Sequence, residues 1–177
     1  MSETDQRFTR LCRAPTQDLE TLFQESRAPE MDSVVGWTFR GWNPPWFCRL
    51  IGISKFMKGF FRGESGVEGY NIPIRQNAFE EEWVPKPSVD HPKRFGFYLV
   101  SECKPESGRP HPDSLLLDYG ASSRNFILDP SRKLRDFLVQ IEPDLLLGKA
   151  YLQLPAVRVP VSFFLLERHV RSDWEPS

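Results

Sequence analysis

The chain has 177 residues, a length that suits one domain with a substantial buried core. Its 23 basic and 24 acidic residues give a formal net charge of -1, which excludes the overall basic excess typical of nucleic-acid-binding domains and polybasic membrane-surface proteins. Hydrophobic residues make up 40% of the sequence, too many for a disordered chain, and its 16 prolines favour strands broken by turns.

The sequence predicts a cytoplasmic protein without a membrane span. No run of about 18 apolar residues could cross a bilayer, and the charged first seven residues lack the apolar core of a secretion signal. The cysteines, Cys12, Cys48 and Cys103, are odd in number and far apart, which predicts reduced thiols. We expect no metal and no cofactor, because no ligand spacing or phosphate loop is present.

Residues 1–14 are polar and aperiodic, so we expect a flexible N-terminal arm followed by a single domain over residues 15–177. Thr16 can cap a short helix that has acidic residues in its first turn. The apolar side of this helix is one narrow stripe. Such a stripe predicts a helix that lies on the body of the domain.

The first strand is predicted at residues 33–42, where Val35, Trp37 and Phe39 fall on one face of the strand, and the other face carries Val34, Thr38, Arg40 and Trp42. Gly36 and Gly41 stand beside tryptophans. Glycines at such positions indicate close backbone approach or a bend, as in a sheet that curls to close on itself.

The pairs Gly36-Trp37 and Gly41-Trp42, together with Arg168 in the last predicted strand, resemble the calycin arrangement of lipocalins and fatty-acid-binding proteins. In those families an early Gly-x-Trp strand packs near a late arginine across the bottom of an antiparallel barrel. Glycine and tryptophan are adjacent here, and the resemblance covers the two ends of the chain. It implies a barrel that holds a small apolar ligand.

A helical period replaces the strand period from Trp46 to Phe61, after two prolines and before Gly63. The apolar residues recur at steps of four and three, and basic residues take the remaining surface. We weigh three roles for this amphipathic helix over residues 45–62. It could pack against the sheet, cover a barrel mouth as a lid, or meet a membrane or protein partner.

Further strands are predicted over residues 67–75, 93–104 and 114–119. A second helix is predicted to begin at Asp129-Pro130 and to end before Pro143. Its inward face consists of Leu134, Phe137, Leu138 and Ile141.

The last long apolar block, residues 141–169, predicts two strands joined by a tight connection. Pro155 closes the first of these strands. The second is dense in β-branched and aromatic residues, which favour a half-buried pleated surface. The rest of the chain must supply something for this hairpin to pack against.

Together the elements predict a mainly β fold: an antiparallel β-barrel or strongly curled sheet, calycin-like as the resemblance implies, with two or three short helices. A long aromatic sheet of roughly seven to nine strands avoids exposed edges best by closing. Barrels of this size can enclose one small ligand. A β-sandwich and an open α+β roll are the alternatives.

Candidate binding residues are polar side chains on or beside the predicted strands, where each must find a partner or face solvent. Asp118-Tyr119 and Lys149 with Tyr151 are the pairs that we favour. The full set of candidates is Arg40, Asn71, Arg75, Asp118, Tyr119, Asn125, Lys149 and Tyr151.

Three classes of function are compatible with these observations. The first is a barrel that binds a small apolar molecule with an anionic or carbonyl end. The second is an enzyme of isomerase or cyclase type on the same barrel, with Asp118 and Tyr119 or His169 as acid and base. The third is an interaction subunit that presents the Trp46 to Phe61 helix to a larger partner.

Overall fold

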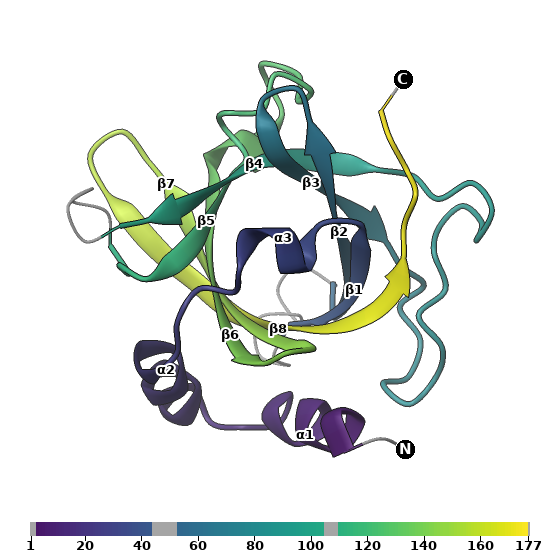
Figure 1. Ribbon diagram of the computed structural model, residues 1–177, viewed down its shortest axis with the longest axis vertical. Coiled ribbons are helices and arrows are strands. Elements are labelled where there is room, and N and C mark those ends of the chain that lie inside the picture. The colour runs from purple at the N-terminus through teal and green to yellow at the C-terminus, as the bar shows by residue number, and fades with distance from the viewer. Residues whose placement is uncertain (1–2, 44–52, 105–109, 177) are drawn as a thin grey trace.

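The computed structural model describes residues 3–43, 53–104 and 110–176, and its strands form a closed antiparallel barrel (Figure 1). Each strand pairs with the next along the chain, and β1 pairs with β8 to complete the ring. The eight strands are β1 Trp37–Trp42, β2 Lys55–Gly63, β3 Gly66–Pro73, β4 Phe95–Cys103, β5 Ser114–Asp118, β6 Leu134–Glu142, β7 Leu145–Gln153 and β8 Arg158–Arg171. The prediction of a mainly β, barrel-forming chain is confirmed.

Three short α-helices accompany the barrel in the described parts of the chain: α1 Glu3–Leu11, α2 Thr16–Glu25 and α3 Met31–Val34. Helices α1 and α2 lie against the outer wall, and α3 lies across one end of the barrel (Figure 1). The prediction of α2 is confirmed, with Leu19 and Phe23 buried on its inner side, but Pro15 holds the cap position and no side chain caps the helix, so the predicted Thr16 cap is wrong. No helix among these residues is long and apolar enough to cross a membrane.

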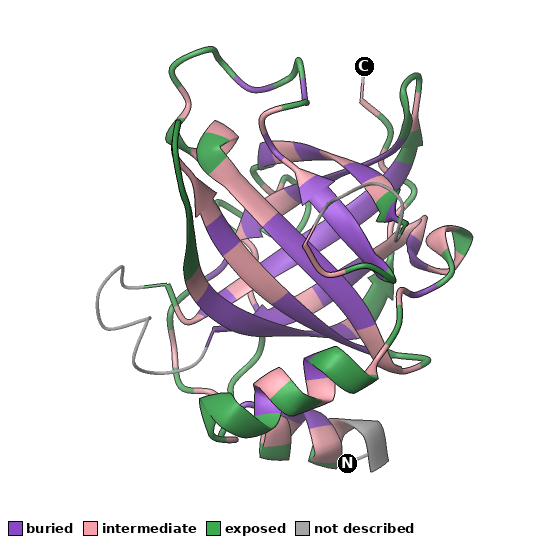
Figure 2. Ribbon diagram, turned by 90° about the vertical axis from the view of Figure 1, so that its left-hand side faces the viewer, coloured by how far each residue is buried: buried purple, intermediate pink, exposed green. Residues whose placement is uncertain are grey.

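Side-chain alternation along the strands creates two separate apolar clusters, because both faces of the barrel wall are covered (Figure 2). The inner cluster lines the lumen and includes Phe39, Phe60 and Tyr98, with Val34 of α3 at one end. The outer cluster lies beneath α1, α2 and the loop between β3 and β4. The first-strand prediction is correct for the faces of Trp37 and Phe39, although residues 31–34 form α3.

Arg168 on β8 closes the end of the barrel that α3 covers. Its guanidinium carbon lies 4.6 Å from the ring centroid of Trp37. The same guanidinium donates hydrogen bonds of 3.0 Å to the carbonyl of Ser33 and to the carbonyl of Pro143. One side chain thus joins α3, the β6–β7 turn and the first strand.

The predicted amphipathic helix over residues 45–62 is wrong where the structure describes it, because Lys55–Gly63 is strand β2. Residues 44–52 lie outside the described residues. The strand has apolar side chains on both faces, with Phe56 and Phe60 in the lumen and Met57 and Phe61 outside. Because apolar side chains are buried on both faces, their spacing along the sequence imitates that of an amphipathic helix. Residues 55–62 therefore form no helix that could cover the barrel mouth or bind a partner.

The predicted helix after Asp129 is also wrong. A single 3-10 turn, η2 Pro130–Lys133, follows Asp129, whose side chain accepts a hydrogen bond from the backbone of Ser131. Residues 134–142 then form β6. Leu138 packs in the lumen while Phe137 packs beneath α2, and this double burial again imitates a helical period.

The start of the chain differs from the flexible arm that we expected. Residues 3–11 form α1, and Phe8 is fully buried. Its ring contacts Phe79 and Trp83 at centroid distances of 6.1 and 6.4 Å. Helix α1 is therefore packed on the barrel through an aromatic anchor.

Candidate ligand site inside the barrel

Lys58 is a charged residue in a lumen lined mainly by aliphatic and aromatic side chains. It lies in the middle of β2, between the inward-facing Phe56 and Phe60, and only 3% of its surface is exposed. A buried ammonium requires hydrogen-bond partners and a counter-charge. The neighbouring strands provide both.

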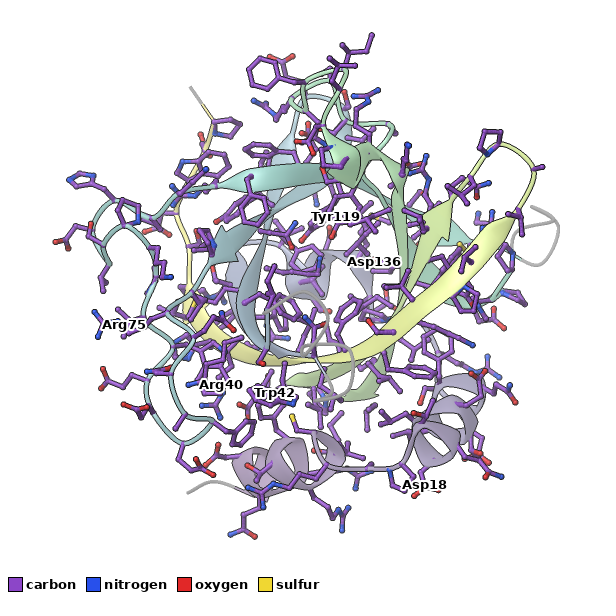
Figure 3. The ribbon with its side chains drawn as sticks, turned by 180° about the vertical axis from the view of Figure 1, so that it is seen from behind. Asp18, Arg40, Trp42, Arg75, Tyr119 and Asp136 are labelled. Atoms are coloured by element: carbon purple, nitrogen blue, oxygen red, sulfur yellow. The ribbon has the colours of Figure 1, made fainter. Side chains whose placement is uncertain are left out.

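Three oxygen atoms surround the Lys58 ammonium, one for each of its N–H donors. It donates to Asn71 Oδ1 at 2.9 Å and to the hydroxyl of Tyr119, and it lies 3.1 Å from Asp136 Oδ2. The Tyr119 hydroxyl in turn donates to Asp136 Oδ2 at 2.9 Å. We call Lys58, Asn71, Tyr119 and Asp136 the lysine cluster; Tyr119 and Asp136 lie together inside the barrel in Figure 3.

Aromatic rings enclose the lysine cluster on several sides. The Lys58 nitrogen lies 5.0 Å from the ring centroid of Tyr98, 5.1 Å from Tyr119, 5.3 Å from Phe164 and 5.8 Å from Phe56. These distances are within the range of cation–π attraction. The site therefore combines one cation with apolar, polarizable walls.

Two of these rings lie directly over a glycine of the neighbouring strand. A Cβ atom at Gly148 would lie 2.0 Å from the Phe164 ring, and one at Gly69 would lie 2.2 Å from the Tyr98 ring. The rings occupy the space that wall side chains would otherwise fill.

Burial shifts the ionisation of the cluster. It lowers the pKa of Lys58, and the carboxylate of Asp136 opposes this effect through its charge and its hydrogen bond. Burial also raises the pKa of Tyr119 well above its ordinary value, and the negative charge of Asp136 raises it further. The phenol therefore remains a proton donor, while the amine is less basic than a lysine in water.

The structure brings Asn71 and Tyr119 together, whereas the other predicted site residues lie elsewhere. Asp118 follows the strand alternation to the opposite face from Tyr119, where its carboxylate lies 3.1 Å from Arg135 Nε. Asn125 lies at the base of the β5–β6 loop and bonds the backbone of Phe97. The favoured pair of Asp118 with Tyr119 therefore does not share a site.

Lys149 and Tyr151 face outward beneath α2. The Lys149 ammonium donates to both carboxylate oxygens of Glu20, at 2.8 and 2.6 Å. The Tyr151 hydroxyl lies 2.6 Å from His111 Nε2. These contacts attach α2 and the β4–β5 loop to the outer wall.

Arg40 and Arg75 also lie on the outside of the barrel (Figure 3). Arg40 forms ion pairs with Asp5 of α1 and with Glu167 of β8, so it fastens α1 to the wall. Arg75 lines an open surface groove of about 680 Å³ that also contains two lysines. The groove is lined by Pro73, Arg75, Val84, Pro85, Lys86, Pro87 and Lys93.

Sequence reasoning missed Lys58 and Asp136. Lys58 was assigned to the polar face of the incorrect helix over residues 45–62, and Asp136 fell within the second incorrect helix. Phenylalanines two positions before and two positions after Lys58 indicate a strand face with a lysine at its centre. Among the described residues, no group of three or more His, Cys, Asp or Glu side chains could hold a metal ion.

Comparisons with protein-family models, with curated proteins and with solved structures gave no match. The function must therefore be argued from the geometry of the barrel and of the lysine cluster.

Proposed function

We propose that the protein binds a small apolar molecule inside the barrel, with a carbonyl or anionic end of the ligand at the lysine cluster. The observation that carries this proposal is the enclosed ammonium of Lys58, placed among aromatic rings in the lumen. A site of this type, with apolar surroundings and a few convergent polar groups, suits such a ligand. An eight-stranded barrel is large enough for one small molecule.

The hydrogen bonds of the cluster indicate how the ligand would be held. Asn71 and Tyr119 are the neutral acceptors on Lys58, and neutral acceptors bind an ammonium more weakly than carboxylates do. Tyr119 is also bonded to Asp136, so Asn71 is the acceptor without a bond to the carboxylate. Its amide nitrogen has a separate partner, the carbonyl of Gly96 at 2.8 Å. A ligand oxygen would therefore replace Asn71 Oδ1 on Lys58, while Asp136 remains as the counter-charge.

We also propose a relationship to the calycins. The contact that the resemblance implies, an early tryptophan beside a late arginine, is present between Trp37 and Arg168 at one end of the barrel. Glycine precedes this tryptophan directly, unlike in the family pattern. The proposal therefore rests on the barrel and on this contact.

Native mass spectrometry of the protein from its own host tests the binding function, by comparison with the denatured mass. We expect a small molecule of definite mass that stays with the folded chain and is lost on unfolding. A second test titrates the chain with cis-parinaric acid, a fluorescent fatty acid. Lys58→Met should weaken its binding roughly tenfold, the effect of one lost charged hydrogen bond.

Lys149→Met is the matched control, since Lys149 also pairs with a carboxylate but lies outside the barrel. It should bind the probe as the wild type does. An empty wild-type chain in the mass spectrum, together with a Lys58→Met variant that binds cis-parinaric acid normally, would refute the proposal.

An enzyme of isomerase or cyclase type is a second candidate, favoured by one specific observation. The Tyr119 phenol is placed between an ammonium and a carboxylate, in a chain of hydrogen bonds that could pass a proton to a carbonyl oxygen. Asp136 takes the place that we expected for Asp118. If the wild type converts a carbonyl compound, Tyr119→Phe should still bind that compound but should no longer convert it. This result would distinguish an enzyme from a protein that only binds its ligand.

A further inference from the structure

The loop between β5 and β6, residues 119–133, presents three consecutive apolar side chains to solvent. Phe126 and Ile127 are each 87% exposed, and Leu128 is 90% exposed. No other large hydrophobic residue in the described parts of the chain is exposed to this degree. In Figures 1 and 2 the loop projects beyond the barrel wall on the side away from α1 and α2. We call Phe126, Ile127 and Leu128 the apolar tip.

Hydrogen bonds at the base of the loop hold this tip outward. The buried Asn125 amide donates to the carbonyls of Phe97 and Tyr119, at 2.6 and 2.9 Å, and accepts from the Phe97 backbone at 2.8 Å. The guanidinium of Arg132 donates to three further carbonyls, those of Gly120, Ser122 and Asn125. A base constructed in this way keeps the tip from folding back onto the barrel.

A tight turn shapes the tip itself. The backbone N–H of Asp129 donates to the carbonyl of Phe126 at 2.9 Å. The Asp129 side chain then accepts from the Ser131 backbone at 2.8 Å. The apolar residues are therefore presented in one fixed shape, so little conformational entropy is lost when they bind.

Positive charge accompanies the tip. The loop contains three basic residues, Arg124, Arg132 and Lys133, and one acidic residue, Asp129, although the whole chain has a net charge of -1. Lys133 is exposed and has no salt-bridge partner among the residues that the structure describes. Arg124 is also exposed and shares its charge with Glu68.

We propose that the apolar tip inserts into the interfacial region of an anionic lipid bilayer, with Lys133 and Arg124 at the lipid headgroups. Apolar side chains that project from a surface can enter the acyl-chain boundary of a bilayer without a complementary groove. Exposed cations beside them are attracted to acidic lipids, and the two effects together give the stable attachment that either gives poorly alone. Tyr119, the first residue of this loop, belongs to the lysine cluster, so attachment would bring the candidate site near the membrane.

The test is co-sedimentation of the full chain with vesicles of phosphatidylcholine, with or without phosphatidylserine. We expect binding to the vesicles that contain phosphatidylserine, and weaker binding as salt is added. The triple variant Phe126→Ser, Ile127→Ser, Leu128→Ser should bind at least roughly tenfold less. Lys133→Glu should weaken binding several-fold, by about the contribution of one to two surface charges.

Val170→Ser is the matched control, because Val170 is an exposed apolar residue at the other end of the barrel. Its vesicle binding should equal that of the wild type. All of these substitutions are at the surface, and a thermal unfolding curve of each variant verifies its fold. A loss of binding in Val170→Ser as large as that in the triple variant would overturn the assignment to the apolar tip.

A second measurement reports insertion directly. In the variant Phe126→Trp, brominated acyl chains should quench the added tryptophan fluorescence, whereas the same tryptophan at Val170 should remain unquenched. The proposal is overturned if the wild type does not co-sediment with phosphatidylserine vesicles, or if brominated lipids do not quench the tryptophan at position 126. A triple variant that keeps vesicle binding but loses a protein partner would assign the tip to a protein interface instead. None of these results depends on the ligand proposed for the lumen.

Discussion

Lys58 Nζ and Asp136 Oδ2 lie 3.1 Å apart, although β2 and β6 are on opposite sides of the ring. Strands β3, β4 and β5 separate them on one side, and β7, β8 and β1 separate them on the other. The ion pair therefore spans the lumen and ties two opposite walls together. Its strength affects both the stability of the barrel and the charge offered to a ligand.

We expect the Lys58–Asp136 pair to show strong coupling in a double-mutant cycle. Asp136→Asn or Lys58→Met alone should lower the free energy of unfolding by about 3 to 5 kcal/mol, because each leaves a buried charge without its partner. The double variant Lys58→Met, Asp136→Asn should lose less than the sum of the single changes. Urea unfolding measures all of these values. Additive losses would contradict a direct pair.

Arg168→Met should destabilise the barrel by about 2 to 4 kcal/mol, because the variant loses a cation–π contact and two hydrogen bonds to carbonyls. Arg171→Met provides the control. Arg171 also lies over Trp37, at 4.1 Å, but it is exposed, so its loss should amount to less than about 1 kcal/mol. Equal losses in chemical denaturation would show that the carbonyl bonds of Arg168 contribute nothing.

Asn125→Ala should lower the free energy of unfolding by about 2 to 4 kcal/mol, since it leaves partly buried backbone groups of Phe97 and the buried carbonyl of Tyr119 without partners. Ser123→Ala, at an exposed position in the same loop, should change it by less than about 0.5 kcal/mol. Hydrogen exchange at the Phe97 amide should accelerate in Asn125→Ala alone. Unchanged exchange would argue against the role of Asn125 as the base of the loop.

His111 should make the protein less stable in mild acid. Its burial lowers its pKa, and Lys149 lowers the pKa further, while Glu20 opposes this effect. Between the folded and unfolded pKa values the unfolded chain binds more protons, so stability rises with pH and is lost as pH falls below the unfolded value of about 6.5.

Unfolding curves at several pH values, from about 7 down to about 5, test this expectation. His111→Gln should show a shallower loss of stability than the wild type over that range. His91→Gln, at an exposed loop position, should follow the wild type. Parallel curves for all three proteins would assign the acid sensitivity to other groups.

The strands with one clear pattern could be predicted from the sequence. The β-branched and aromatic residues of the segment 141–169 predict a hairpin, and the structure has strands β7 and β8 there. Trp37 and Phe39 share one face of their strand as expected, and this face is directed toward the lumen. In both segments the strand preference of the residues agrees with the way their side chains are buried in the folded barrel.

The strands that are buried on both faces could not be recognised from the spacing of their apolar residues, because this spacing does not alternate. Phe137 and Leu138 are adjacent and both fully buried, one beneath α2 and the other in the lumen. In a single sequence this arrangement has the spacing of an amphipathic helix. The same ambiguity concealed Lys58, since a lysine between phenylalanines was assigned to the solvent face of a helix.

The candidate site was predicted in part. Asn71 and Tyr119 were identified because polar groups on strands need partners. The carboxylate that holds them together, Asp136, comes from the opposite wall, and no local pattern shows which strands face each other across a closed ring. Lys149 and Tyr151 were predicted on correct strands but lie on the outer face.

Because β1 pairs with β8, the barrel can close only after the last strand has been synthesised. During synthesis β1 has no partner on its free side until the chain has been made as far as β8. Until then the partial sheet has two open edges, at β1 and at the newest strand, which could pair with other chains. Such distant pairing folds slowly. We therefore expect a chain that stops after β7 to aggregate, even though it already carries every member of the lysine cluster.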